Sequence, residues 1–244
     1  MGAGRVVGDR QQSGHKGFRF GFQKFCGHFI YVRFALSLLK VKGRQVTDSW
    51  IQTDEAEDVA GSLRHVIRVA EYVEKDAQAW KWVVLALHSA LQGACVCHLT
   101  TAAVPIGAVT ERNAVEWSNY FEELRTNPNA KLPKTYLMAL PDLLKAVRKP
   151  LSAGDGRNSA GIAISDAEFD WLKRFHDSVR NQFTHFKPMG WSVEVSGIPD
   201  IATLISRIIG EILEMGWAFR HQDVAQREEL KCSLSKLTGP IWPS

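Results

Sequence analysis

The sequence is poor in cysteine and has neither a long apolar run nor an internal repeat. Four cysteines in 244 residues do not make the disulfide framework that is typical of small secreted domains, so we expect a reducing, cytoplasmic setting. Arg33 interrupts the most apolar stretch, residues 29–39, and no run of about 18 apolar residues exists. The sequence therefore predicts no membrane-spanning helix and no membrane partner.

The spacing that a structural zinc site needs is also missing. Cys95, Cys97 and His98 are neighbours in the sequence, but residues two apart on a helix point about 200° away from each other. No second pair of ligands follows at the spacing of a zinc site. We expect these cysteines to be buried and structural, and we predict no metal site and no cofactor.

Acidic residues are almost absent from the first 45 positions, where nine basic residues accompany Asp9 alone and give a net charge of +8. The remaining chain has 21 basic and 25 acidic residues, a net charge of −4, so it predicts no broad nucleic-acid-binding surface. Three interpretations of residues 1–45 stay open: a basic arm that binds nucleic acid, a targeting peptide, or a disordered, spurious extension translated from upstream of the true start. We favour the third, because a well-capped, acidic segment begins at Val46, where a GTG codon would place a bacterial initiator.

Beyond this extension, periodic apolar residues predict an all-α fold. We expect helices at residues 54–76, 77–99, 113–125, 134–147 with a break at Pro141, 166–186, and from Pro199 onward. Together they predict a largely antiparallel bundle of about five to six helices within residues 46–225. Residues 226–244 are expected to form a polar C-terminal tail, and poor order is expected from Arg220 onward.

Residues 77–99 are apolar almost all round, as in the central helix of a bundle. Lys81, His88 and Gln92 nevertheless fall on one narrow stripe of this helix. Polar side chains on a buried helix need partners. We therefore expect His88 and Gln92 to bond to a neighbouring helix or to line a cleft.

One later stretch contains a complete helix signature. Ser165 followed by Glu168 is a capping box, which predicts a helix that begins at Asp166. Pro188 cannot continue a helix and restricts the residue before it, so we expect this helix to stop near Phe186.

The polar side chains of this helix share one face. At about 100° per residue that face includes Arg180, Asn181 and His185. Three further residues on it are candidates for binding: Lys173, Asp177 and Thr184. Gln182 and His176 intrude on the apolar side.

Arg180, Asn181 and His185 suit phosphodiester chemistry. Arginine can hold two phosphate oxygens through its planar fork, histidine can move a proton, and asparagine can orient either of them. The C-terminal end of a helix favours positive charge, which helps to keep His185 protonatable near neutral pH. The alternative is a solvated face in which Arg180 pairs with Asp177 and His185 caps free carbonyl groups.

The pattern Arg180-Asn181-x-x-x-His185, at the end of the penultimate long helix of a bundle, resembles the signature of the HEPN superfamily. That signature is an Arg, usually followed by a polar residue, with a His roughly four to six residues after the Arg. The resemblance covers roughly residues 54–221 as an architecture and implies a dimer whose two motif helices face each other. It also implies a metal-independent endoribonuclease. In that likeness His185 is the general base or acid at the ribose 2′-hydroxyl, Arg180 stabilises the charge on the scissile phosphate, Asn181 positions both, and the product is a 2′,3′-cyclic phosphate.

The likeness also bears on partners and role. HEPN toxins that are paired with a nucleotidyltransferase antitoxin often continue as His-x-Tyr, whereas this chain has His185-Phe186-Lys187. An antitoxin or nucleotidyltransferase partner stays a candidate, as does a role in toxicity, defence or stress. Two alternatives remain open: a non-catalytic HEPN-like module that binds a nucleotide or a protein and dimerises through the face of Arg180 and His185, and a structural bundle with a coincidental motif.

Overall fold

The computed structural model describes residues 51, 53–101, 105–185 and 190–243, and the backbone of residues 21–22 and 32–33. The chain divides into two units, Met1–Ser49 and Trp50–Ser244. In the first unit, β1 (Gly21–Phe22) and β2 (Val32–Arg33) form a short antiparallel pair. The predictions made for the rest of residues 1–45 lie outside the described residues.

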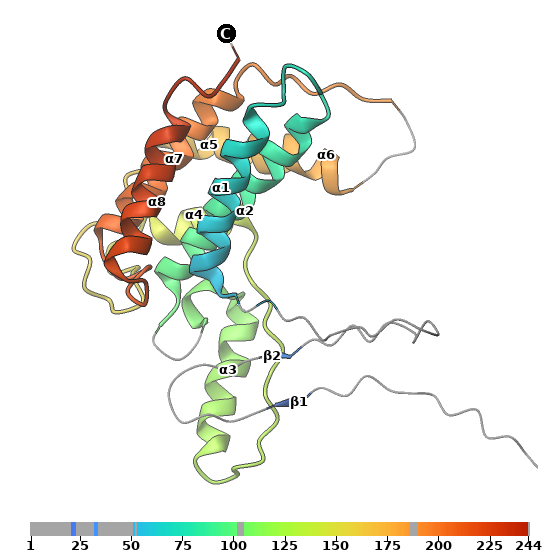
Figure 1. The fold of residues 1–244 in the computed structure, drawn as a ribbon. Coiled ribbons are helices and arrows are strands. Elements are labelled where there is room, and N and C mark those ends of the chain that lie inside the picture. The colour runs from blue at the N-terminus through green and yellow to red at the C-terminus, as the bar shows by residue number, and fades with distance from the viewer. Residues whose placement is uncertain are drawn as a thin grey trace, which may run out of the picture. The chain divides into compact units, whose positions relative to one another are not determined.

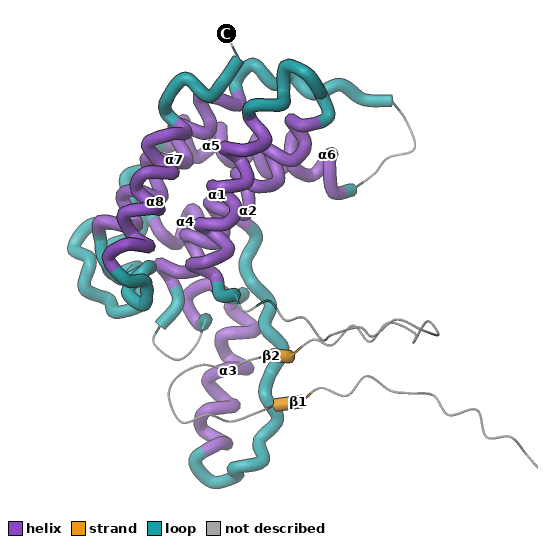
Figure 2. Tube along the Cα trace, in the orientation of Figure 1, coloured by secondary structure: helices purple, strands orange, loops and turns teal. Residues whose placement is uncertain are grey.

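The described part of the second unit is helical, which confirms the predicted all-α class (Figures 1 and 2). Its elements are α1 (Glu55–Ala70), α2 (Ala79–Leu99), the 3₁₀ turn η1 (Ile106–Ala108), α3 (Glu111–Leu124), α4 (Leu140–Val147), α5 (Asp166–Arg174), the π-helical turn η2 (Phe175–Arg180), α6 (Asn181–Thr184), α7 (Ile198–Glu214) and α8 (Val224–Leu237). Figure 1 shows α3 pointing away from the other helices of this unit.

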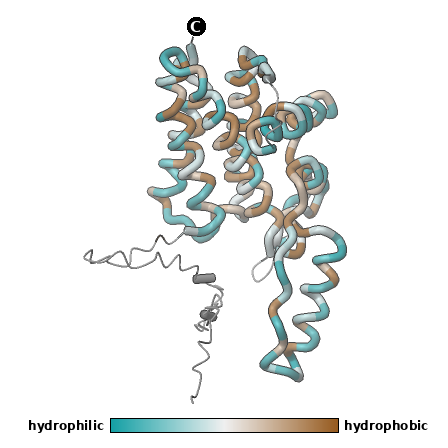
Figure 3. Tube along the Cα trace, turned by 90° about the vertical axis from the view of Figure 1, so that its right-hand side faces the viewer, coloured by the Kyte–Doolittle hydropathy of each residue, from teal (hydrophilic) through white to brown (hydrophobic). Residues whose placement is uncertain are grey.

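The central helix is α2, and α1, α4, α7 and η2 all contact it. Its apolar side chains include Leu87, Leu91 and Ala94, which are fully buried. By length and composition α2 is the one described helix that could cross a membrane, yet 72% of its most apolar window is buried inside the bundle. Figure 3 shows apolar and polar residues alternating along the helices, as burial of one helix face requires.

Helix α1 begins at a local cap and packs closely on α2. The Asp54 carboxylate accepts the N–H of Glu57 at 2.8 Å, which fixes the first turn. Val59 is fully buried, and a Cβ added at Gly93 of α2 would lie only 2.8 Å from its Cγ2. The glycine therefore sets the close approach of the two helices. The helix ends at Ala70, earlier than predicted, and turns lead into α2.

The prediction of a helix over residues 134–139 is wrong. Asn113 of α3 is 1% exposed, and its Nδ2 donates to the carbonyl of Lys134 at 2.7 Å while its Oδ1 accepts the N–H of Tyr136 at 2.8 Å. An isolated antiparallel bridge follows at Leu137. These bonds use the backbone groups that a helix would need, so α4 begins only after this segment.

The prediction of a poorly ordered polar tail is wrong for residues 224–237, which form α8. A capping box between Asp223 and Gln226 starts this helix, and it contacts α1 and α7. Three leucines at helical spacing are buried: Leu230, Leu234 and Leu237. Beyond the helix, Trp242 stacks on Trp80 of α2 with 6.1 Å between ring centres. The C-terminal segment is thus part of the bundle.

Candidate functional site

The predicted motif helix is one continuous helical run made of α5, η2 and α6. Its predicted start is confirmed: Ser165 Oγ accepts the N–H of Glu168 at 3.3 Å, and Glu168 Oε2 accepts the N–H of Ser165 at 2.8 Å. The run ends at Thr184, because His185 has a non-helical backbone (φ −117°, ψ 84°). The predicted end at Phe186 lies outside the described residues.

A π-helical turn, η2, interrupts the α-helical geometry of this run. The N–H of Asn181 donates to the carbonyl of His176, five residues earlier, and not to the residue four earlier. Each such turn holds one more residue than an α-helical turn, so a spacing of about 100° per residue does not apply through it. Single π-turns inside α-helices are frequent at functional sites.

In this turn His176 meets His88 of α2. His88 Nε2 and His176 Nδ1 lie 2.8 Å apart, and the two rings stack with 5.0 Å between their centres. His88 is 3% exposed and the His176 side chain 13% exposed. The expectation that His88 bonds to a neighbouring helix is therefore confirmed. Gln92, one turn further along α2, is half-buried and has no hydrogen bond among the described residues.

Both imidazoles are held neutral at pH 7. Burial, the charge of Arg180 and the His176 ring together lower the pKa of His88 to about 3. Burial also lowers the pKa of His176; the carboxylate of Asp177 opposes this effect, whereas Arg180 and Lys173 add to it. Between two neutral rings a single hydrogen joins the facing nitrogens, so one ring donates and the other accepts.

Arg180 is half-buried, and no carboxylate of the described residues pairs with it. Its Nη1 donates to Asn181 Oδ1 at 2.9 Å, and this neutral amide is its one side-chain partner in the described part of the chain. Pairing of Arg180 with Asp177 does not occur, because Asp177 accepts from Lys173 Nζ at 3.0 Å. A half-buried cation without a counter-ion favours the binding of an anion.

His185 lies exposed just after α6. Its backbone N–H donates to the carbonyl of Asn181 at 2.9 Å, while its ring has no partner among residues that the structure describes. The ring therefore caps none of the carbonyl groups that the structure describes; Thr184 Oγ1 instead lies 3.4 Å from the carbonyl of Arg180. The structure thus joins the side chains of Arg180 and Asn181, whereas His185 is bonded to Asn181 through its backbone alone.

The residue that sequence reasoning missed is His176. Its one signal is that it stands as a polar residue on the apolar side of a helical projection. That anomaly has a physical cause, since the ring is buried against a second histidine and not against apolar side chains alone. A polar residue on the apolar face of a helix therefore predicts a hydrogen-bonding partner elsewhere in the chain.

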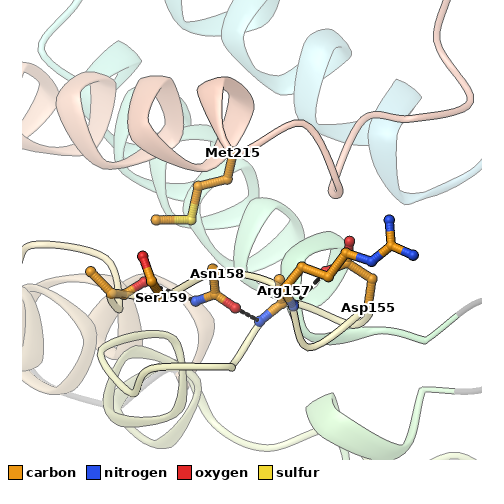
Figure 4. Close-up of a pocket in the computed structure, with 7 residues that line it drawn as sticks. Asp155, Arg157, Asn158, Ser159 and Met215 are labelled. Atoms are coloured by element: carbon orange, nitrogen blue, oxygen red, sulfur yellow. Dashed lines mark hydrogen bonds between the residues drawn. The ribbon is translucent and has the colours of Figure 1, made fainter.

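A pocket of about 310 Å³ lies apart from the motif residues, none of which lines it. Its walls come from the loop of residues 153–160 and from Met215 after α7, and Figure 4 shows Met215 opposite Asn158 and Ser159. Asn158 shapes the loop, because its Oδ1 accepts the N–H of Ala153 at 2.8 Å. The pocket belongs to this loop and not to the motif helix.

Neither a metal cluster nor a known relative identifies the site. Within the described ranges, no group of three or more His, Cys, Asp or Glu side chains could hold a metal ion. Comparison with models of protein families, with curated proteins and with solved structures finds no significant match. Membership of the HEPN superfamily therefore stays a prediction that rests on the motif and on the helix order.

Proposed function

We propose that the chain is a cytoplasmic, metal-independent endoribonuclease that acts as a homodimer. The observation that carries this proposal is Arg180, a half-buried cation that is tied to Asn181 and has no carboxylate partner in the described part of the chain. The exposed residue His185 follows directly after the same helical run. A cation without a counter-ion and a titratable imidazole are the groups that phosphodiester cleavage needs. The likeness to the HEPN superfamily supports the same assignment.

In the proposed reaction, Arg180 holds two oxygens of the scissile phosphate and stabilises the charge that builds there. His185 removes the proton of the ribose 2′-hydroxyl, and the freed oxygen forms a new bond to phosphorus. The bond from phosphorus to the 5′-oxygen breaks, that oxygen takes up a proton, and a 2′,3′-cyclic phosphate remains. Asn181 fixes the plane of the guanidinium through its 2.9 Å bond.

The proposal uses two copies because residues five apart on an α-helix point about 140° away from each other, so Arg180 and His185 of one chain converge poorly on one phosphate. In a twofold dimer whose motif helices face each other, the arginine of one protomer and the histidine of its partner form one composite site. The same exposed face would also receive an antitoxin or a nucleotidyltransferase partner. Toxicity, defence or stress are the roles that the family likeness suggests.

The test incubates the purified full-length protein with a mixed RNA pool in EDTA, beside the double variant Arg180→Ala/His185→Ala. We expect the wild type to leave 2′,3′-cyclic phosphate ends and the double variant to lose at least about 100-fold in rate, since acid–base catalysis alone contributes roughly 10²–10⁴-fold. Arg174→Ala is the matched control, because Arg174 is an exposed cation of the same run with no side-chain partner among described residues.

The possible outcomes separate two functions. Cleavage that persists at the full rate in the double variant would overturn the proposed chemistry. No cleavage by any of the three proteins, with all of them folded and dimeric, would favour the non-catalytic module that binds a nucleotide or a protein partner.

A further inference from the structure

The reaction proposed above leaves the His88–His176 pair without a role. Both rings are largely buried, they are joined at 2.8 Å, and they sit where a π-helical turn meets the central helix. The positive charge of Arg180 acts on both of them. The pKa of each imidazole therefore depends on the net charge at Arg180, which a bound anion would change.

The charged groups that face the pair can be named for the described residues. From the motif run they are Arg180, Lys173 and Asp177, and from α2 the facing titratable group is His88 itself. Lys173 Nζ and Asp177 Oδ2 form an ion pair at 3.0 Å, and Asp177 Oδ1 lies 4.0 Å from His176 Nε2. At His176 the carboxylate of Asp177 has a larger effect than either cation, whereas Arg180 is the charged side chain that acts on both rings.

The pair can take up one proton and still keep its hydrogen bond. One hydrogen already lies between His88 Nε2 and His176 Nδ1, and a second one there would set two N–H donors against each other. An added proton must therefore settle on a nitrogen that faces outward. When His176 Nδ1 is the donor to His88 Nε2, His176 Nε2 carries no hydrogen and is the favoured position, because that ring retains some exposure and Asp177 lies beside it.

We propose that a phosphate group bound at Arg180 makes the His88–His176 pair take up one proton from solvent. Burial does most to keep the pair neutral, and the charge of Arg180, four residues after His176 in the same turn, adds to it. An anion bound at Arg180 offsets that charge, so the protonated form is no longer disfavoured by it. The site then gains a second positive charge only while it is occupied. This inference takes its ligand class from the proposed function, and inorganic phosphate and an RNA phosphodiester would both act through the same charge.

NMR of the full-length, histidine-labelled protein measures this uptake, since the Cε1–Hε1 signal of each ring reports its own titration. We expect saturating inorganic phosphate at constant ionic strength to raise the titration midpoint of His176, because the charge of Arg180 lowers the pKa of this ring and a bound anion offsets that charge. A 2′-O-methyl oligonucleotide, which lacks the attacking hydroxyl, should act in the same way. The ligand that acts at the lower concentration identifies the source of the phosphate.

Three variants sharpen the measurement. Arg180→Gln should raise the midpoint of His176 without any ligand and abolish the response to phosphate, because it removes the charge that couples them. Arg180→Lys keeps that charge and should keep part of the response. Arg174→Gln removes an exposed charge from the same run and should change neither.

Two results would overturn the inference. In the first, phosphate or the oligonucleotide moves the signal of His185 while the midpoint of His176 stays fixed. In the second, neither ligand moves any of these signals. RNA cleavage is scored separately: cleavage without proton uptake overturns this inference alone, whereas proton uptake without cleavage overturns the nuclease and leaves an anion-binding module.

Discussion

At the scale of single residues, the site combines one cation and two neutral histidines. Asp177, the acidic residue nearest to them, is bound to Lys173 at 3.0 Å and does not compensate Arg180. The arrangement has a cost, because burial and a nearby positive charge both disfavour protonation of His88. That cost makes the stability of the protein depend on pH.

Acid should destabilise the protein through His88. A histidine whose pKa is lower in the folded than in the unfolded state binds more protons when unfolded. Its stabilising contribution is therefore complete above about pH 6.5 and is lost as the pH falls toward its folded pKa of about 3. His88→Gln, which keeps a hydrogen-bonding group opposite His176, should flatten this fall by up to about 1.4 kcal/mol per pH unit.

Urea denaturation at several pH values between those limits measures the slope. His98→Gln is the matched comparison, since burial lowers the pKa of this second histidine of α2 to about 4 and its Nε2 lies 3.0 Å from Ser152 Oγ, outside the candidate site. It should flatten the same range without altering the response of His176 to phosphate. Parallel stability curves for wild type and His88→Gln would contradict the assignment.

At the scale of elements, the π-turn η2 decides which side chains of the motif run meet α2. Deleting Ser178, an exposed residue of this turn with no side-chain partner among the described residues, should restore α-helical register. The deletion would shorten the spacing between His176 and Arg180 from four residues to three and so change the orientation of Arg180 relative to the histidine pair. We expect circular dichroism to show retained helix, and we expect RNA cleavage and phosphate-linked proton uptake to be lost.

The control for the deletion is Ser178→Ala, which keeps the length of the turn and should keep both activities. A deletion variant that cleaves RNA at the rate of the wild type would show that the π-turn does not position Arg180. The comparison therefore separates the geometry of the turn from the chemistry of its side chains.

Helix starts could be predicted because their bonds are local. The capping box of Ser165 and Glu168 and the cap at Asp54 join residues three apart, and both helices begin where the sequence indicates. The π-turn could not be predicted in this way, since its geometry accompanies a contact between His176 and His88 from another helix. Local patterns specify ends of elements well and irregular turns inside them poorly.

Both wrong helix assignments involve contacts with residues far away in the sequence, which a local pattern does not show. The carbonyl of Lys134 is bonded by Asn113, which lies 21 residues earlier, so the competing structure is invisible within the segment itself. In α8 the apolar signal is thin, because polar residues separate the leucines that pack on α1 and α7. Spacing could place Arg180, Asn181 and His185 on one face, but the meeting of His176 with His88 beside this face depends on a tertiary contact.

At the scale of the whole molecule, the proposed site belongs to two protomers. This can be tested by combining two different inactive variants in one dimer. Coexpressed Arg180→Ala and His185→Ala chains pair at random, so about half of the dimers are mixed, and each mixed dimer has one complete composite site out of two. We expect the mixture to recover about a quarter of the wild-type cleavage rate. Each variant alone should be inactive.

Mixed dimers can be purified with two different affinity tags, and mass spectrometry can verify their composition. The control is a mixture of Arg180→Ala with Asn181→Ala/Arg180→Ala, in which no pairing restores the arginine. Mixed Arg180→Ala and His185→Ala dimers that form but remain inactive would show that each site uses groups from one chain only.

His88 and His176 are 88 residues apart in the sequence, so the ribosome synthesises them at different times. Helices α1 and α2 are neighbours in the chain and can pack as soon as both have left the ribosome, because contacts between sequence neighbours form fastest. The turn that carries His176 and Arg180 is synthesised much later. A growing chain therefore holds a folded helical pair long before it holds a phosphate site, and the order of synthesis delays any activity of the motif until most of the bundle exists.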